Sequence, residues 1–337
     1  MVQNVHPYLW DYREPIEREE SCCVFEEAFM PQTAEQRELK KIGRNQRVTL
    51  TKILVTTDFS EASDRALDYA IALARRYDAR IYLTHVITPD PFQFAEPQLA
   101  QATYEKVRQA AEEGITDILI SGKLRGLPHE VLMDEGSVWP TLDKMIVEHE
   151  IDLVVAGTHG RGKVQKLLIG SVAEEIFRQA STAVLMVGPA VKGGTASEIE
   201  FKHILFATDF GSGAEKAAAH AFSLAQEHNA RLTLLHVIET AAAYTEERVA
   251  RQCDINVARM KQLMPAGSEN WCHPEFRVIY GAAVEEILIA ARESKADLIV
   301  MGAKARRSLA GHAPLTIAYN VVTRSICPVL TVRGYFR

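Results

Sequence analysis

The chain has 337 residues, of which 47% are hydrophobic and 24% are charged, and its formal net charge is −6. At roughly 150 residues per domain, this length predicts two domains and a remainder, and the composition excludes a disordered, collagen-like or coiled-coil chain. The negative charge argues against a nucleic-acid partner, and no apolar run reaches the ~18–20 residues of a membrane span. The N-terminus lacks the apolar core of a signal peptide, so we expect a cytoplasmic protein without a membrane partner.

Residues 1–49 are predicted to form an N-terminal extension. Residues 11–27 are mainly acidic and 37–47 mainly basic. The segment is interpreted either as a solvated or self-pairing extension or as a regulatory, partner-binding arm. The five cysteines include adjacent Cys22 and Cys23 but no CxxC pair, which argues against a disulfide framework or a zinc site. Cys327 is expected to be a small buried residue.

Strand and helix patterns alternate after this extension. Short apolar runs predict buried strands, and apolar residues at helical spacing, such as Ala66, Ala70 and Leu73, predict helices between them. Ser60 or Ser63 is the candidate N-cap of the first helix. The predicted strands are Ile53–Thr57, Arg80–Val86, Val131–Asp134, Leu153–Gly157 and Ala183–Val187, and the predicted helices are Ser60–Tyr77, Gln98–Leu119, Ser137–His149 and Leu168–Gln179.

The same pattern then recurs. Residues 53–86 align without gaps to 204–237, with 14 of 34 positions identical, and 136–187 align to 281–332. The offset falls from 151 to 145 residues between the two blocks, so the length difference is expected in a loop or helix end. The predicted domains are repeat 1 (residues 50–190) and repeat 2 (residues 201–337), joined by a linker over 191–200. Strands of repeat 2 are predicted at Ile204–Thr208, Arg231–Val237, Phe276–Tyr280, Leu298–Gly302 and Val329–Val332.

Alternating strands and helices indicate an α/β fold with parallel, doubly wound sheets. Ligands of such sheets bind beyond the carboxyl ends of the strands, where the strand order reverses. In repeat 1 these ends carry Asp58 and a glycine-rich loop from Gly157 to Gly162, followed by Gly170-Ser171 at a helix start. Glycines allow close backbone approach, and a helix N-terminus suits an anion such as phosphate. An acidic side chain suits a ribose hydroxyl, so the combination suggests a nucleotide.

The loop GTHGRGKV superficially matches a P-loop, but Val164 stands where the magnesium-binding hydroxyl should be. We therefore reject a true P-loop. His159 in this loop is expected to be a solvated turn residue. His85 and His236 occupy equivalent positions at the second strand of each repeat, and their repetition favours a structural role.

The spacing Gly157-x2-Gly160-x9-Gly170-Ser171 resembles the ATP-binding signature of universal stress proteins, G-2x-G-9x-G-(S/T). The resemblance extends to Thr57-Asp58-Phe59-Ser60 and His85-Val86, and it covers about 52–188 and 203–333. It implies a tandem universal stress protein. Each repeat would then be a five-stranded parallel sheet of order 3-2-1-4-5, with helices on both faces.

The resemblance also implies the site residues in repeat 1. Asp58 would accept hydrogen bonds from the ribose, and the glycine loop and Ser171 would surround the triphosphate of ATP, bound with or without Mg²⁺. Thr56 stands where some family members have proline. The implied nucleotide-binding residues are Thr56, Asp58, Val86, Ala156, Gly157, Gly160, Arg161, Gly170, Ser171 and Val172.

Repeat 2 departs from this signature. Ala305 replaces the second glycine and Leu315 the third, and a Cβ at these positions crowds a phosphate. We expect a degenerate site that does not bind ATP in the family manner, although Lys304, Arg306 and Arg307 offer charge for another anion. The family residues that persist are Asp209, Val237, Gly302 and Thr316.

The leading hypothesis is an ATP-binding regulatory protein of the stress response that is at most a slow ATPase. One alternative is a nucleotide-free dimerisation scaffold, and a less favoured one is a nucleotidyl-transfer enzyme of a related α/β fold. The fifth strands, Ala183–Val187 and Val329–Val332, are candidates to pair within the chain, which would make one protein resemble a dimer. A further homodimer through another surface is also considered.

Overall fold

The computed structural model describes residues 22–25, 48–88, 97–158, 169–239, 245–303 and 316–334. Repeat 1 contains β2 (Lys52–Thr56), α2 (Glu61–Tyr77), β3 (Arg80–Ile87), α3 (Pro97–Ile120), β4 (His129–Glu135), α4 (Val138–Glu148), β5 (Leu153–Gly157), α5 (Ser171–Gln179) and β6 (Ala183–Val187). Repeat 2 contains β7 (His203–Ala207), α6 (Ala214–His228), β8 (Arg231–Ile238), α7 (Glu246–Gln262), η1 (Ser268–Asn270), β9 (Glu275–Tyr280), α8 (Ala283–Glu293), β10 (Leu298–Ala303), α9 (Ile317–Arg324) and β11 (Val329–Arg333).

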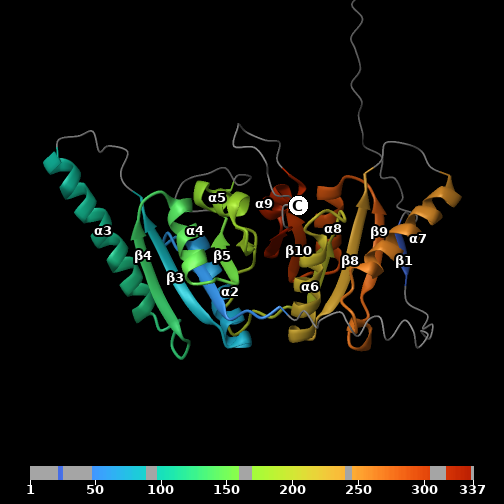
Figure 1. Ribbon diagram of the computed structural model, residues 1–337, viewed down its shortest axis with the longest axis horizontal. Helices are drawn as coiled ribbons and strands as arrows, with labels where there is room; N and C mark the ends of the chain where they lie inside the picture. The colour runs from blue at the N-terminus through green and yellow to red at the C-terminus, as the bar shows by residue number, and fades with distance from the viewer. Residues whose placement is uncertain are drawn as a thin grey trace, which may run out of the picture.

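The described strands form one sheet in the order β1-β9-β8-β7-β10-β11-β6-β5-β2-β3-β4 (Figure 1). Within each repeat the five strands are parallel and follow the order 3-2-1-4-5, so the predicted fold class is confirmed. The repeats meet where β6 pairs antiparallel with β11, with Leu185 opposite Leu330. The two repeats therefore share a continuous sheet.

One strand was not predicted from the sequence. β1 (Cys22–Phe25) belongs to the N-terminal extension and pairs antiparallel with β9, with Cys22 opposite Ile279 and Phe25 opposite Phe276. It covers the outer edge of the sheet in repeat 2. Part of the extension is therefore an element of the fold, which neither interpretation of this segment foresaw.

The side chains of each strand alternate between two cores because successive residues point to opposite faces. Ile53 and Val55 belong to the core that lies under α2, α3, α6 and α7, whereas Leu54 belongs to the core under α4, α5, α8 and α9. Each core contains residues of both repeats. Cys327 is buried in the second core, as expected, and burial raises the pKa of its thiol to about 11.

Helix α2 has a capping residue at each end. The Ser60 hydroxyl accepts the Ser63 amide at the start of α2, which confirms Ser60 as the N-cap, and the helix ends at Asp78 in the left-handed conformation. The second helix differs in length between the repeats, with 24 residues in α3 and 17 in α7. This variation lies outside the core strands.

Candidate functional site

The candidate site lies at the carboxyl ends of β2 and β5. These strands are parallel neighbours, with Val55 opposite Val155, so their ends lie at the same edge of the sheet. The helix that follows β2 packs on one face, and the helix that follows β5 packs on the other. Such a divergence opens a crevice at the point where the strand order reverses.

Asp58 lies in the turn between β2 and α2, where it is half-buried. Its Oδ1 atom accepts the Ser60 amide at 3.1 Å, so the carboxylate is fixed against the first turn of α2. Asp209 makes the same bond to the Gly211 amide at 2.8 Å in repeat 2. Both acidic side chains are therefore positioned by the local backbone.

A phenylalanine holds this turn in an uncommon conformation. Phe59 has a φ of 61° and its equivalent Phe210 has a φ of 57°, in the left-handed region. The Phe59 ring lies 4.7 Å from the ring of His85, and the Phe210 ring lies 4.6 Å from that of His236. Phe59 was quoted as part of the family resemblance, but no role was assigned to either phenylalanine from the sequence, although the identical Thr-Asp-Phe run in both repeats was a usable signal.

The two histidines anchor the turn to the neighbouring strand. Nδ1 of His85 lies 2.8 Å from the Thr57 carbonyl oxygen, and Nδ1 of His236 lies 2.8 Å from that of Thr208. Because a carbonyl oxygen only accepts, each Nδ1 donates the proton. Burial lowers the pKa of His236, which favours the neutral ring. These contacts confirm the structural role expected for both histidines.

Two candidate residues at the end of β5 have different surroundings. The side chain of Ala156 is in the core, so only its backbone is available to a ligand. Gly157 is required by packing, because a Cβ there would lie 2.7 Å from the carbonyl carbon and oxygen of Ala62 at the start of α2. Val86, near the end of β3, is half-buried against the core under α5, and Thr56 is also half-buried.

Helix α5 begins beside these strand ends. Gly170 is its N-cap and provides no side-chain cap, and the Gly170 amide donates to the Thr158 carbonyl at 2.8 Å. The helix therefore begins at Ser171, not at Leu168 as the sequence suggested. The Gly170 amide is engaged within the protein, which removes one expected phosphate donor. Ser171 and Val172 are exposed in the first turn, where helix geometry gives the amides no intrahelical acceptor.

The corresponding helix of repeat 2 has a different cap. The Thr316 hydroxyl accepts the Tyr319 amide at 3.2 Å, so α9 satisfies one of its own first-turn donors. Gly302, the next-to-last residue of β10, lies close to Gly213, and Val237 packs against the same core as Val86. Thr316, which persists in sequence, thus has an intramolecular partner for its hydroxyl group.

Several candidate residues lie outside the described part of the chain. Gly160, Arg161 and His159 fall within residues 159–168. The altered loop of repeat 2 falls within 304–315, which contains Lys304, Ala305, Arg306, Arg307 and Leu315.

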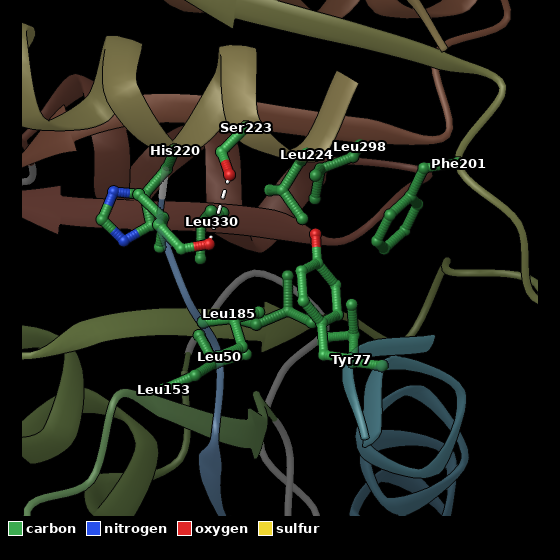
Figure 2. A pocket seen from close by; sticks show the side chains of 12 residues that line it. Leu50, Tyr77, Leu153, Leu185, Phe201, His220, Ser223, Leu224, Leu298 and Leu330 are labelled. Atoms are coloured by element: carbon green, nitrogen blue, oxygen red, sulfur yellow. Dashed lines mark hydrogen bonds between the residues drawn. The ribbon is translucent and has the colours of Figure 1, made fainter. Parts of the chain in front are cut away.

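A small cavity lies elsewhere, between α2 and α6 at the junction of the repeats (Figure 2). Its volume is about 10 Å³, and its lining includes Leu185, Leu330, Tyr77 and His220. This volume holds roughly one water molecule, so the cavity is not a ligand site.

The described residues contain neither a cluster of candidate metal ligands nor a helix that could span a membrane. In that part of the chain no group of three or more His, Cys, Asp or Glu side chains has the arrangement of a metal site. No helix there is long and apolar enough to cross a membrane.

Comparisons with known proteins identify relatives across both repeats. Residues 49–188 and 200–333 match the sequence model of the Universal stress protein family. A universal stress protein of Mycolicibacterium smegmatis is 27% identical over 310 residues, which cover 83% of this chain and 96% of that protein. One from Methanocaldococcus jannaschii is 28% identical over 150 residues, covering 44% and 88%. A universal stress protein structure from Archaeoglobus fulgidus superposes with a TM-score of 0.62 at 20% identity, covering 86% and 98%, and supports the fold.

Proposed function

Because this chain belongs to the universal stress protein family, we propose that it is a regulatory stress-response protein that binds one ATP molecule in repeat 1. Family membership supports the stress-response role. The binding site is the crevice between β2 and β5. Repeat 2 retains the fold without a competent ATP site.

The observation that carries this proposal is the difference between α5 and α9. Gly170 leaves α5 without a side-chain cap, whereas Thr316 caps α9. The first-turn amides of α5 point to the edge of the sheet where the strand order reverses, and such amides favour anions. Asp58 is fixed on the other side of the crevice, where its carboxylate suits a ribose hydroxyl.

Each candidate residue then has a role set by its position. Thr56 and Val86 border the adenine, and Asp58 accepts from the ribose. Backbone atoms of Ala156 and Gly157 approach the ribose. The phosphates contact the amides of Ser171 and Val172, the Ser171 hydroxyl, and the loop that carries Gly160 and Arg161. The amide of Gly170 is bonded to Thr158 and does not donate to the phosphates. The role proposed for Gly170 is that its missing side chain leaves room for them.

The proposed role is binding, with hydrolysis slow or absent. The residues named above supply hydrogen-bond donors and charge but no activated nucleophile. Mg²⁺ would accompany the phosphates only as a counterion, because Val164 lacks the hydroxyl of a P-loop. The antiparallel pairing of β6 with β11 supports a second part of the proposal, that the two repeats act as a dimer within one chain.

Calorimetric titration of the full chain, stripped of nucleotide, tests this function. We expect saturable ATP binding at one site per chain. Gly160→Val places a branched side chain in the phosphate loop and should abolish binding while the circular dichroism spectrum stays unchanged. The matched control is Ala305→Val at the equivalent position of repeat 2, which should bind like the wild type.

Other outcomes would contradict the proposal. Wild-type protein without saturable ATP binding would favour the dimerisation scaffold. Two equal sites per chain would show that repeat 2 is competent. Steady turnover of ATP with a small acceptor molecule would instead indicate a nucleotidyl-transfer enzyme.

A further inference from the structure

A tyrosine of repeat 2 reaches the start of α5 in repeat 1. Tyr319 on α9 is 4% exposed, and its hydroxyl oxygen accepts the Ile169 amide at 3.4 Å. Ile169 is also 4% exposed and directly precedes the N-cap Gly170. Removal of this hydroxyl would leave a buried amide without its acceptor, which is unfavourable.

Two consecutive amides fix the chain as it enters α5. The Ile169 amide donates to repeat 2, and the Gly170 amide donates to Thr158, whose own amide donates to Val187. These bonds determine the direction in which the first turn of α5 starts. They therefore determine where the amides of Ser171 and Val172 point.

Repeat 2 also contacts the other end of α5. The rings of Phe177 and Tyr319 meet edge to face, with centroids 6.0 Å apart. The Arg333 guanidinium donates to the Phe177 carbonyl oxygen near the C-terminus of the helix. Burial lowers the pKa of Arg333 to about 10, so this side chain remains charged at neutral pH. Both ends of α5 are thus held by the neighbouring repeat.

Repeat 1 cannot make the equivalent contacts to the corresponding helix of repeat 2. In the alignment of the repeats, Tyr319 corresponds to Glu174 and Arg333 corresponds to Gly188. Ile169 corresponds to Pro314, which has no amide proton to donate. The support therefore runs in one direction, from the repeat with the degenerate motif to the helix of the repeat with the intact motif.

We propose that Tyr319 is a positioning residue for the anion-binding first turn of α5, so that repeat 2 tunes the phosphate affinity of repeat 1. This inference rests on the proposed ATP site. It explains what the second repeat contributes to binding when its own loop lacks the glycines. Adenosine, which has no phosphate, does not depend on this turn.

The test compares Tyr319→Phe with a matched control, Tyr69→Phe. Tyr69 is 9% exposed and packs against Phe201 on the opposite face of the sheet, away from α5. Loss of one hydrogen bond is expected to weaken ATP binding by about two- to tenfold in Tyr319→Phe. Adenosine affinity should stay unchanged in both variants, and ATP affinity should stay unchanged in Tyr69→Phe. Hydrogen exchange of the Ile169 amide should accelerate only in Tyr319→Phe.

The outcomes separate the two proposals. If the wild type binds ATP and Tyr319→Phe binds ATP and adenosine as the wild type does, the positioning role is overturned and the ATP site stands. Equal losses of ATP and adenosine affinity would show a general structural effect and would also overturn it. If the wild type binds no ATP, the proposed function fails, and the phosphate-tuning role fails with it, whatever the exchange rate of Ile169.

Discussion

Replacement of Gly157 by alanine should destabilise the fold through a collision between β5 and α2. The added Cβ would lie 2.7 Å from the carbonyl carbon and oxygen of Ala62 and 3.0 Å from the Ser63 amide nitrogen. Ordinary van der Waals contact begins near 3.4 Å, and these neighbours are backbone atoms that cannot rotate away. The first turn of α2 must therefore move by more than half an ångström.

The expected cost of Gly157→Ala is about 1–3 kcal/mol of unfolding free energy, as for other overpacked sites. Repeat 2 provides the matched control, because Gly302 occupies the equivalent position. A Cβ there would lie 3.3 Å from the nearest atom, the carbonyl carbon of Gly213, so only a small adjustment is needed. The lower entropy of an unfolded alanine chain offsets this, and Gly302→Ala should stay within about 0.5 kcal/mol of the wild type.

Urea denaturation followed by circular dichroism measures both variants. The midpoint for Gly157→Ala should fall clearly, and that for Gly302→Ala should scarcely change. Equal stability of Gly157→Ala and wild type would refute the packing argument, as would equal losses in the two variants. The result also determines which glycine is suitable for ligand studies. Gly157 has a packing function of its own, so a substitution in the loop at Gly160 is the cleaner probe of the proposed ATP site.

The remaining two predictions concern stability. Burial, with Arg76 nearby, lowers the pKa of His228 from 6.5 to about 4, and its Nε2 has no hydrogen-bond partner among the described residues. The unfolded chain then takes up a proton before the folded chain does, so stability should be full above pH 6.5 and fall from 6.5 toward 4. His228→Phe should reduce the fall in the urea midpoint between pH 7 and 5, and the control His129→Phe, at an exposed position, should not. An equal pH dependence of the midpoint in His228→Phe and the wild type would contradict this prediction. Thr316→Ala should cost about 1 kcal/mol by removing the bond to the Tyr319 amide, and an unchanged midpoint would exclude the cap.

The strands could be predicted because they depend on signals that are local in sequence, whereas their order was implied by the family resemblance. Runs such as Ala183–Val187 are continuously apolar, which is typical of strands that are covered on both faces. The right-handed crossover rule then leaves few arrangements, and the family resemblance selected one of them. Ser60 was one of the two candidate caps for the same reason, since its side chain and the amide that donates to it are three residues apart.

Three other features that depend on distant residues were not predicted. The pairing of Cys22–Phe25 with β9 joins segments more than 250 residues apart, and neither segment specifies the other by its pattern. The reason for Gly157 was also hidden, because its neighbour Ala62 belongs to another element. The hydrogen bond between Tyr319 and Ile169 joins the two repeats. An alignment of one repeat with the other shows which positions are equivalent, but it does not show which residues are in contact.

The two repeats satisfy the same helix end in different ways, and this difference bears on function more than the shared fold does. In α9 the Thr316 hydroxyl accepts a first-turn amide of the same helix. In α5 the N-cap Gly170 has no side chain, so the first-turn amides can donate to a ligand. Glycine in place of a capping side chain costs only a few tenths of a kcal/mol, and an anion at the helix N-terminus returns about 0.3–1 kcal/mol. The uncapped start of α5 therefore costs little stability when no ligand is bound, and it contributes favourably to the binding of an anion. Because α5 is held at both ends by residues of repeat 2, its donors keep their direction without a cap of their own.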